Sequence, residues 1–258
     1  MIPKIIHLCW MSGEAYPEKI QLCIDSWKKY LPDYEIMLWN AQTFDVNITK
    51  WTKEAFECKK YAFVADYVRF WALHEYGGIY FDSDVEVVRS LDCFLDCDCF
   101  FGYEYSGLPE AAVVGAVRNL KWMEHALQWY EQSTFVKSNG EYNAVVAPLI
   151  FRYAFEKETG VRLHGSAKAF QKNNVLFQVF SESYFSPKDG YNGKIYMTKN
   201  TYTIHHFQAA WKRNTIKNRL NKFLHFFVKR CLGRELFFKI MYYFRSKKIK
   251  TNFYFICS

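Results

Sequence analysis

The chain lacks several features that would place it in a special class of protein. It has no apolar run long enough to cross a membrane, no low-complexity segment and no internal repeat. Its eight cysteines include no Cys-x-x-Cys pair, so we expect scattered reduced thiols rather than a zinc module or a disulfide framework. No apolar leader opens the chain, because the hydrophobic segment at residues 5–10 is short and contains His7. These absences favour a cytosolic globular protein without a signal peptide or a Golgi-type anchor.

What is present indicates one main catalytic domain with a large core. Half of the 258 residues are hydrophobic and 20% are aromatic. Strand-like and helix-like segments alternate in the first part of the chain, which is typical of an α/β protein. The predicted strands are residues 5–10, 34–39 and 100–104, and the predicted helices are 18–30, 61–76, 120–133 and 142–159. We expect residues 92–199 to form the side of the catalytic domain that binds the acceptor substrate.

Two aspartates follow a short apolar strand that begins at the pair Gly77-Gly78. Because side chains alternate along a strand, Asp82 and Asp84 are expected on one side of it. Carboxylate oxygens suit Mn²⁺ or Mg²⁺, and these ions keep coordination positions open for substrate phosphates. The pattern predicts a metal and diphosphate site, with a solvated turn as the alternative. A second pair, Asp96-Cys97-Asp98, follows a polar stretch and is not predicted to be a site.

Two charged side chains interrupt the mostly apolar helix predicted at residues 61–76. Asp66 and Arg69 stand three residues apart, so they lie on one helical face. They form either an internal ion pair that closes the core or a polar patch that faces sugar hydroxyls and phosphate.

These stretches together resemble the signature of the DXD sugar transferases of glycosyltransferase family 32. The resemblance rests on Ala65-Asp66-Tyr67-Val68-Arg69 followed by Gly77-Gly78-Ile79-Tyr80-Phe81-Asp82-Ser83-Asp84. Residues 2–10 resemble the opening strand of the family, Trp39-Asn40 resembles its second strand end, and residues 205–211 resemble its closing motif of paired histidines and a tryptophan. The resemblance implies a GT-A fold, which is an α/β fold that binds nucleotide-sugars.

The resemblance also implies the metal ligands and the catalytic pair. Asp84 would bind Mn²⁺ or Mg²⁺ directly, and Asp82 would contact the metal shell, the donor ribose or the sugar. His206, in preference to His205, would be the third metal ligand. His7 is expected to be structural.

Further residues are implied to form the donor site. Trp10 would lie at the nucleotide base, Tyr80 would line the same pocket, and Asp66 and Arg69 would hold donor-sugar hydroxyls. Trp211 would donate its indole N–H to the leaving diphosphate. The two alanines before Trp211 stand where the family often has serine, so a water would replace that hydroxyl.

The end of the chain is predicted to be a separate unit, residues 212–258, after a catalytic domain at residues 1–211. Residues 212–250 hold thirteen Lys or Arg against the single acid Glu235, a net charge of +12 in a chain of +8. Apolar residues recur there at helical spacing. Such a basic amphipathic tail either binds an anionic membrane surface or packs on the catalytic domain as a helix pair.

From these features we predict a metal-dependent, retaining glycosyltransferase. The donor would be a nucleotide-sugar, most of all a UDP-sugar, and the acceptor a hydroxyl of a bacterial surface glycan, such as a capsule or O-antigen glycan on a lipid carrier. The protein would be cytoplasmic and peripheral on the inner membrane. One alternative is a metal-dependent nucleotide-sugar phosphohydrolase. The other is a nucleic-acid-binding protein, which would explain only the basic tail and leave Asp82 and Asp84 without a role.

Overall fold

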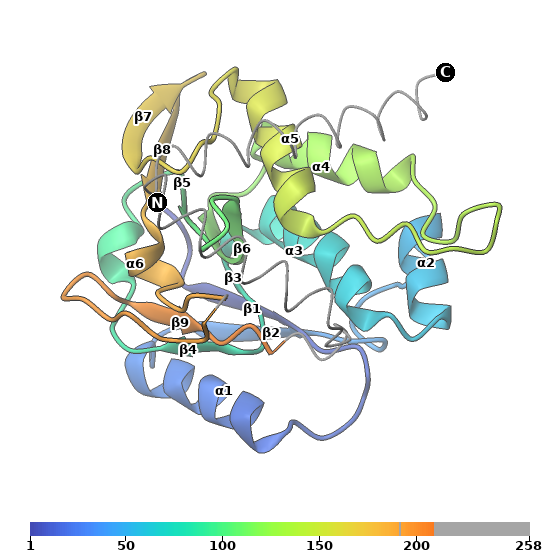
Figure 1. Ribbon diagram of the computed structural model, residues 1–258, viewed down its shortest axis with the longest axis horizontal. Helices are drawn as coiled ribbons and strands as arrows, with labels where there is room; N and C mark the ends of the chain where they lie inside the picture. Colours follow the sequence, from blue (N-terminus) through green and yellow to red (C-terminus); the bar gives the residue numbers. More distant parts are fainter. Residues whose placement is uncertain (191, 209–258) are drawn as a thin grey trace.

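The computed structural model describes residues 1–190 and 192–208, and this part of the chain forms an α/β fold (Figure 1). The predicted tail at residues 212–258 therefore lies outside the described residues. Within them, a seven-stranded mixed sheet has the order β2-β1-β3-β6-β5-β8-β7, and β4 and β9 form a small antiparallel sheet. The strands are β1 (Ile5–Cys9), β2 (Glu35–Trp39), β3 (Gly78–Phe81), β4 (Val85–Val87), β5 (Cys99–Tyr103), β6 (Pro109–Ala116), β7 (Lys168–Lys172), β8 (Val175–Phe180) and β9 (Thr203–His205).

The direction of the strands decides which residues meet at the site. β1 pairs in parallel with β2 and with β3, so these three strands end at the same edge of the sheet. β6 runs antiparallel to β3, with Phe81 opposite Val113. The first residues of β6 therefore extend just beyond the last residue of β3, at the edge where ligands of α/β sheets bind.

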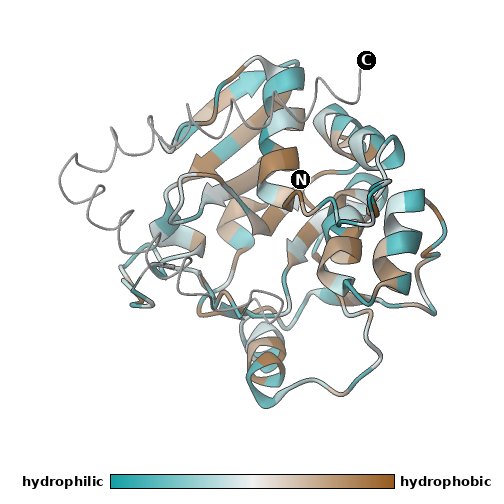
Figure 2. Ribbon diagram, turned by 45° about the vertical axis from the view of Figure 1, so that its right-hand side comes forward, coloured by the Kyte–Doolittle hydropathy of each residue, from teal (hydrophilic) through white to brown (hydrophobic). Residues whose placement is uncertain are grey.

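Helices cover the sheet on two sides and enclose two cores. They are α1 (Glu18–Tyr30), α2 (Lys50–Glu57), α3 (Tyr61–Tyr76), α4 (Lys121–Glu131), α5 (Ala147–Thr159) and the short α6 (Glu182–Phe185), with a 3₁₀ turn at Asp92–Phe94. Hydrophobic residues gather on the sheet and on the inward faces of the helices (Figure 2). Within the described residues, no helix is both long and apolar enough to serve as a membrane span.

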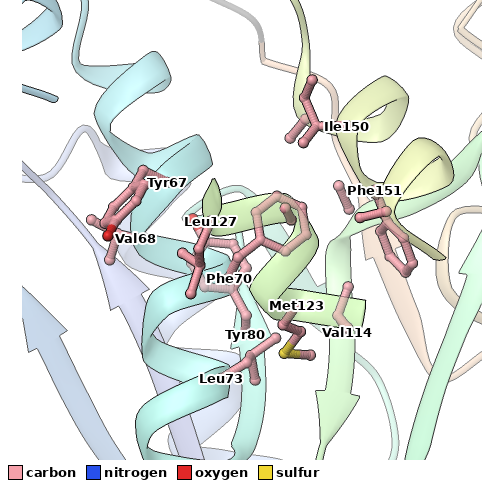
Figure 3. Close-up of a cluster of buried hydrophobic side chains, with 14 of the residues drawn as sticks. Tyr67, Val68, Phe70, Leu73, Tyr80, Val114, Met123, Leu127, Ile150 and Phe151 are labelled. Carbon is pink, nitrogen blue, oxygen red and sulfur yellow. The ribbon is translucent and has the colours of Figure 1, made fainter. Parts of the chain in front are cut away.

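Alternation along β3 assigns its side chains to these two cores. Tyr80 packs with α3, α4 and α5, whereas Ile79 and Phe81 pack on the opposite face with α1. Figure 3 shows the first of these cores, where Phe70 of α3 lies near Phe151 of α5 and Met123 of α4. A strand buried on both faces cannot shift its register, so the residues that follow it are held firmly.

The backbone requires the two glycines between α3 and β3, Gly77 as the cap of α3 and Gly78 as the first residue of β3. Gly77 ends α3 with φ of 66°, and Gly78 has φ of 105°. A Cβ on Gly78 would lie 2.7 Å from the carbonyl oxygen of Ile5 on β1. Only glycine combines this conformation with so close an approach, so the Gly-Gly turn sets β3 against β1.

His7 is structural, as predicted. Its buried ring accepts the indole N–H of Trp39 at Nδ1 (3.2 Å), which leaves Nε2 to donate to the carbonyl of Gly77 (2.7 Å). Burial lowers the pKa of His7 to about 4, so the ring is neutral. The six cysteines among the described residues are all free, in agreement with the prediction of unpaired thiols.

Candidate functional site

Asp82 and Asp84 come together through a turn. β3 ends at Phe81, and the amide of Val85 donates to the carbonyl of Asp82 (3.0 Å) before β4 begins. The prediction that Asp82 and Asp84 lie in one strand and face the same way by alternation is therefore wrong. The two carboxylates nevertheless converge, because the turn brings them together. Asp82, Asp84 and His205 each offer a ligand atom, and these atoms all lie within 4.8 Å of one another.

The structure brings His205 to this cluster instead of the predicted His206. Nε2 of His205 lies 3.4 Å from Oδ1 of Asp84 and 4.0 Å from Oδ2 of Asp82. Nε2 of His206 instead lies 2.9 Å from Oε2 of Glu86. The two histidines are adjacent at the end of β9, where successive side chains point to opposite sides, so only one of them can face the aspartates.

A buried carboxylate, Glu110, lies behind His205. One Glu110 oxygen accepts the amide of Ala112 (2.9 Å), and the other accepts the hydroxyl of Ser186. Nδ1 of His205 lies 3.3 Å from Oε1 of Glu110, within ion-pair distance. Glu110 is 2% exposed and stands at the start of β6, the antiparallel strand. No sequence motif marks Glu110, because only the strand direction brings it to the site.

Arg69 ties α3 to the aspartate turn. Its guanidinium donates to Asp66 (3.0 Å), to Asp82 (3.1 Å) and to the carbonyl of Ala111 (2.5 Å), and it lies over the ring of Tyr80. The two interpretations of the Asp66 and Arg69 pair therefore combine: Arg69 is buried within an ion-pair network, and the network lines the cavity described next.

A cavity of about 1360 Å³ joins these groups. The predicted site residues Trp10, Asp66, Arg69, Tyr80, Asp82 and Asp84 all line it, together with His205. The Trp10 indole donates to the carbonyl of Glu14 (2.8 Å) and meets the edge of Tyr16. Tyr80 is almost wholly buried beneath Arg69 and so reaches the cavity only at its base. Trp211 lies outside the described residues.

Part of the cavity wall comes from the segment that was predicted to bind the acceptor substrate. Residues 143–150, which include the start of α5, line the cavity together with the aspartates. The predicted helix at 142–159 begins only at Ala147, because Val146 is extended and Pro148 occupies the first turn, where its missing N–H costs nothing.

Buried charged groups shift the pKa values of Asp84, His205 and Asp66 away from their usual values. Burial disfavours ionisation of Asp84, yet the charge of His205, its hydrogen bond and the amide of Gln208 together hold the pKa of Asp84 at about 2. Burial likewise opposes protonation of His205, but Glu110 and Asp84 raise its pKa well above the usual value. Burial raises the pKa of Asp66 to about 7 against the opposing charge of Arg69. A divalent cation that binds at Asp84 would therefore meet an ionised carboxylate.

The donor set fits a divalent cation. Two carboxylates and one imidazole converge from two segments, the β3–β4 turn and the end of β9, and one side of the group faces the cavity. Hard oxygen ligands favour Mn²⁺ or Mg²⁺, and three protein ligands leave positions for phosphate oxygens. The second pair, Asp96 and Asp98, is used differently: Asp98 accepts the amide of Leu176 (2.8 Å).

A mixed α/β sheet ends in an Asp-x-Asp turn beside a large cavity, as expected for the predicted GT-A fold. The family model described as the glycosyltransferase sugar-binding region containing the DXD motif matches residues 17–101. Residues 17–101 are thus similar to the sugar-binding region of glycosyltransferases, and the resemblance to the DXD sugar transferases is confirmed.

Curated relatives are similar to parts of the chain. Inositol phosphoceramide mannosyltransferase 3 of Schizosaccharomyces pombe is 39% identical over 36% of this chain and 27% of its own length. Mannosyl phosphorylinositol ceramide synthase CSH1 of Saccharomyces cerevisiae is 29% identical over 69% of this chain and 51% of its own length. The matches thus span about half, or less, of these two yeast proteins.

A solved structure is also similar over most of the chain. It is a glycosyltransferase involved in the glycosylation of the major capsid of PBCV-1, with 10% identity and a TM-score of 0.48. The similarity covers 86% of this chain and 97% of that chain.

Proposed function

We propose that the chain transfers a hexose from a nucleoside diphosphate sugar to a hydroxyl of a lipid-linked acceptor, with Mn²⁺ or Mg²⁺ as cofactor. The observation that carries the proposal is the convergence of Asp82, Asp84 and His205 at one wall of the cavity. Asp84 and His205 would hold the cation, and Asp82, which is already bound to Arg69, would be shared between the cation and the donor.

A bound cation would neutralise the charge that develops on the leaving diphosphate. The chain's own groups would orient the donor. Asp66 and Arg69 are fixed to each other on α3, so they present their remaining hydrogen-bonding capacity to sugar hydroxyls from a rigid helix. Trp10, which also lines the cavity, offers an apolar ring for the base. Retention of the anomeric configuration is part of the proposal and rests on the family resemblance.

The relatives change the proposed acceptor. The sequence predicted a bacterial surface glycan, whereas the curated relatives are yeast proteins named for transfer to inositol phosphoceramide. What the two acceptors share is a polar hydroxyl group carried on a lipid, and we propose that shared class. GDP-mannose is a candidate donor beside the UDP-hexoses, because one relative is named a mannosyltransferase. A test of donor binding must therefore include both. Action at a cytoplasmic membrane face stays a proposal.

A thermal-shift panel tests the donor. A ligand that binds only the folded chain at a hundred times its Kd adds about 2.7 kcal/mol of stability, which raises Tm by several degrees. We expect one nucleoside diphosphate series to raise Tm with Mn²⁺ present and to lose most of that effect with EDTA. A response that is the same with and without Mn²⁺ would contradict the proposed metal site.

Product analysis separates the transferase from the phosphohydrolase alternative. With the donor found in the panel, a transferase releases nucleoside diphosphate and moves the intact hexose to an acceptor hydroxyl or to water. A phosphohydrolase instead cleaves within the diphosphate and yields nucleoside monophosphate and sugar phosphate. The second product pattern would overturn the proposed function.

A further inference from the structure

An exposed apolar run lies on the loop that leads into β9. Ile195, Tyr196 and Met197 are 42%, 54% and 56% exposed. Other large exposed hydrophobic residues among the described ones, such as Leu22 and Ile48, occur singly along the chain. Single exposed hydrophobic residues are normal on soluble proteins. A contiguous exposed run either marks a binding surface or lowers the solubility of the protein.

The loop is held in place by hydrogen bonds, so its exposure is not the fraying of a loose segment. Residues 187–189 pair with residues 194–196 as a small hairpin, in which the amide of Tyr196 donates to the carbonyl of Pro187 (3.0 Å) and the amide of Asp189 donates to the carbonyl of Lys194 (2.8 Å). Arg89 donates to the carbonyl of Lys199. In Figure 1 this orange segment extends outward beside α6 and β9. The backbone therefore presents the three apolar side chains to solvent in a fixed conformation.

Basic residues flank the run. Lys194 and Lys199 bracket it and are exposed, and Arg89 contacts the same loop. The acid within the hairpin, Asp189, accepts the amide of Asn192 and so caps the turn. An aromatic and two aliphatic side chains between cations are typical of a segment that enters the interface of an anionic bilayer, where the apolar groups are buried and the cations meet lipid phosphates.

Both ends of the loop reach the candidate metal site. At its start, Lys188 donates to the carbonyl of His206. At its end, the chain passes directly into β9 and His205. β9 starts at Thr203, six positions after Met197, a span of at most about 22 Å in a fully extended chain. A bilayer touching the loop would thus lie close to the reacting groups.

We propose that Ile195, Tyr196 and Met197, with Lys194 and Lys199, form a docking surface for anionic lipid bilayers. The proposal rests on the proposed function only for its purpose, which is to hold the cavity near a lipid-linked acceptor. Docking itself needs neither donor nor metal, so it can be measured separately from catalysis.

Vesicle flotation with the full chain is the first test. Replacing all three apolar residues by serine (I195S, Y196S, M197S) should lower partitioning onto phosphatidylglycerol vesicles at least tenfold. The matched control replaces two isolated exposed residues (L22S, I48S) and should bind like the wild type. Phosphatidylcholine vesicles should bind the wild type more weakly, because the lysines lose their partners. Equal partitioning of the triple variant and the wild type would overturn the proposal.

A label at the loop gives a second test that does not depend on the triple variant folding. The background replaces the exposed Cys93 and the two cysteines of residues 212–258 by serine. An environment-sensitive fluorophore on Met197→Cys should shift to the blue when phosphatidylglycerol vesicles are added, whereas the same label on Ile48→Cys should not. An unshifted label at residue 197 would overturn the proposal whatever flotation shows. Nucleotide-sugar hydrolysis by these variants should equal that of the wild type, and its absence from all proteins would count against the proposed function alone.

Discussion

At the scale of single residues, Asp84 is the side chain on which the proposed chemistry depends most. Its carboxylate is ionised, faces His205 and accepts the amide of Gln208 (2.7 Å). Asp84→Asn keeps the shape and removes the charge. Loss of a metal contact worth several kcal/mol predicts a fall in kcat of roughly a hundredfold or more.

The measurement is hexose transfer with the donor identified by thermal shift, with circular dichroism as a check on folding. Wild-type activity should also disappear with EDTA and return with Mn²⁺. The matched control is Asp98→Asn, which alters the second Asp-x-Asp pair and should keep normal kcat. If Asp84→Asn transfers hexose at the wild-type rate, the site is elsewhere.

The two adjacent histidines allow a second prediction. His205→Ala should weaken Mn²⁺ binding at least tenfold, because it removes a group that lies 3.4 Å from Asp84. His206→Ala should change it little, since that ring contacts Glu86 instead. Titration of Mn²⁺ by electron paramagnetic resonance compares the two variants without relying on turnover. The opposite order would return the ligand role to His206, as the sequence first indicated.

Glu110 supplies a third prediction, as a positioning residue. Its buried carboxylate holds the amide of Ala112 and the hydroxyl of Ser186 and faces Nδ1 of His205. A carboxylate behind a metal-binding histidine typically contributes ten- to a hundredfold to metal affinity. Glu110→Gln should therefore weaken Mn²⁺ binding by about tenfold or more while the free energy of unfolding without metal changes far less. A purely structural role would lower stability and leave Mn²⁺ affinity intact.

Residue-level prediction from the sequence worked where the signal is local. Asp66 and Arg69 share a helical face, so their spacing alone predicted their proximity. Asp82 and Asp84 do converge as predicted, but through the β3–β4 turn and not through alternation along a strand. The resemblance favoured His206 over His205, whereas the structure places His205 at the aspartates, because the choice depends on which face of β9 meets the β3–β4 turn. Prediction from the sequence missed Glu110, which reaches the site through an antiparallel strand pairing that no local pattern encodes.

At the scale of elements, the Gly-Gly turn that starts β3 can be tested. Gly78→Ala places a Cβ 2.7 Å from the Ile5 carbonyl at a φ of 105°, so we expect a loss of roughly 2–5 kcal/mol in unfolding free energy. Gly140→Ala is the matched control, because it has φ of 79° but nothing within 4 Å of the new Cβ. It should cost only about 1–2 kcal/mol. Urea unfolding midpoints measure both, and equal losses would show that the contact with β1 does not matter.

Elements with strong local patterns were predicted well. The helices at residues 18–30 and 61–76 have the predicted bounds, and the predicted strands at 5–10 and 34–39 are β1 and β2 within a residue. The long strand β6 was missed, because its glycine, alanines and charged residue give neither a clear alternation nor a helical period. The two-sided burial of β6 comes from tertiary packing.

At the scale of the whole molecule, the charge distribution separates two parts. Residues 212–250 carry a net +12, so the rest of the chain carries −4 in a total of +8. Several acidic residues of the rest of the chain line the cavity, namely Asp66, Asp82, Asp84, Glu104 and Glu110. An acidic site needs a cation before it can accept an anionic diphosphate, whereas the basic segment attracts anionic surfaces directly. The sequence showed this separation, because net charge requires no knowledge of the fold.

Removal of residues 212–258 tests that separation. Each basic residue near an anionic leaflet contributes about 1 kcal/mol, so losing thirteen of them should lower partitioning onto phosphatidylglycerol vesicles at least a hundredfold. High salt should weaken full-length binding only in part, because screening acts on charge and leaves apolar burial unchanged. The shortened chain keeps every described residue of the cavity, so it should still hydrolyse the donor and should still show the smaller contribution of the loop at residues 194–199. If the shortened chain binds vesicles like the full chain, the basic segment is not a membrane anchor. If it loses its cooperative unfolding transition, that segment instead completes the core of the catalytic domain.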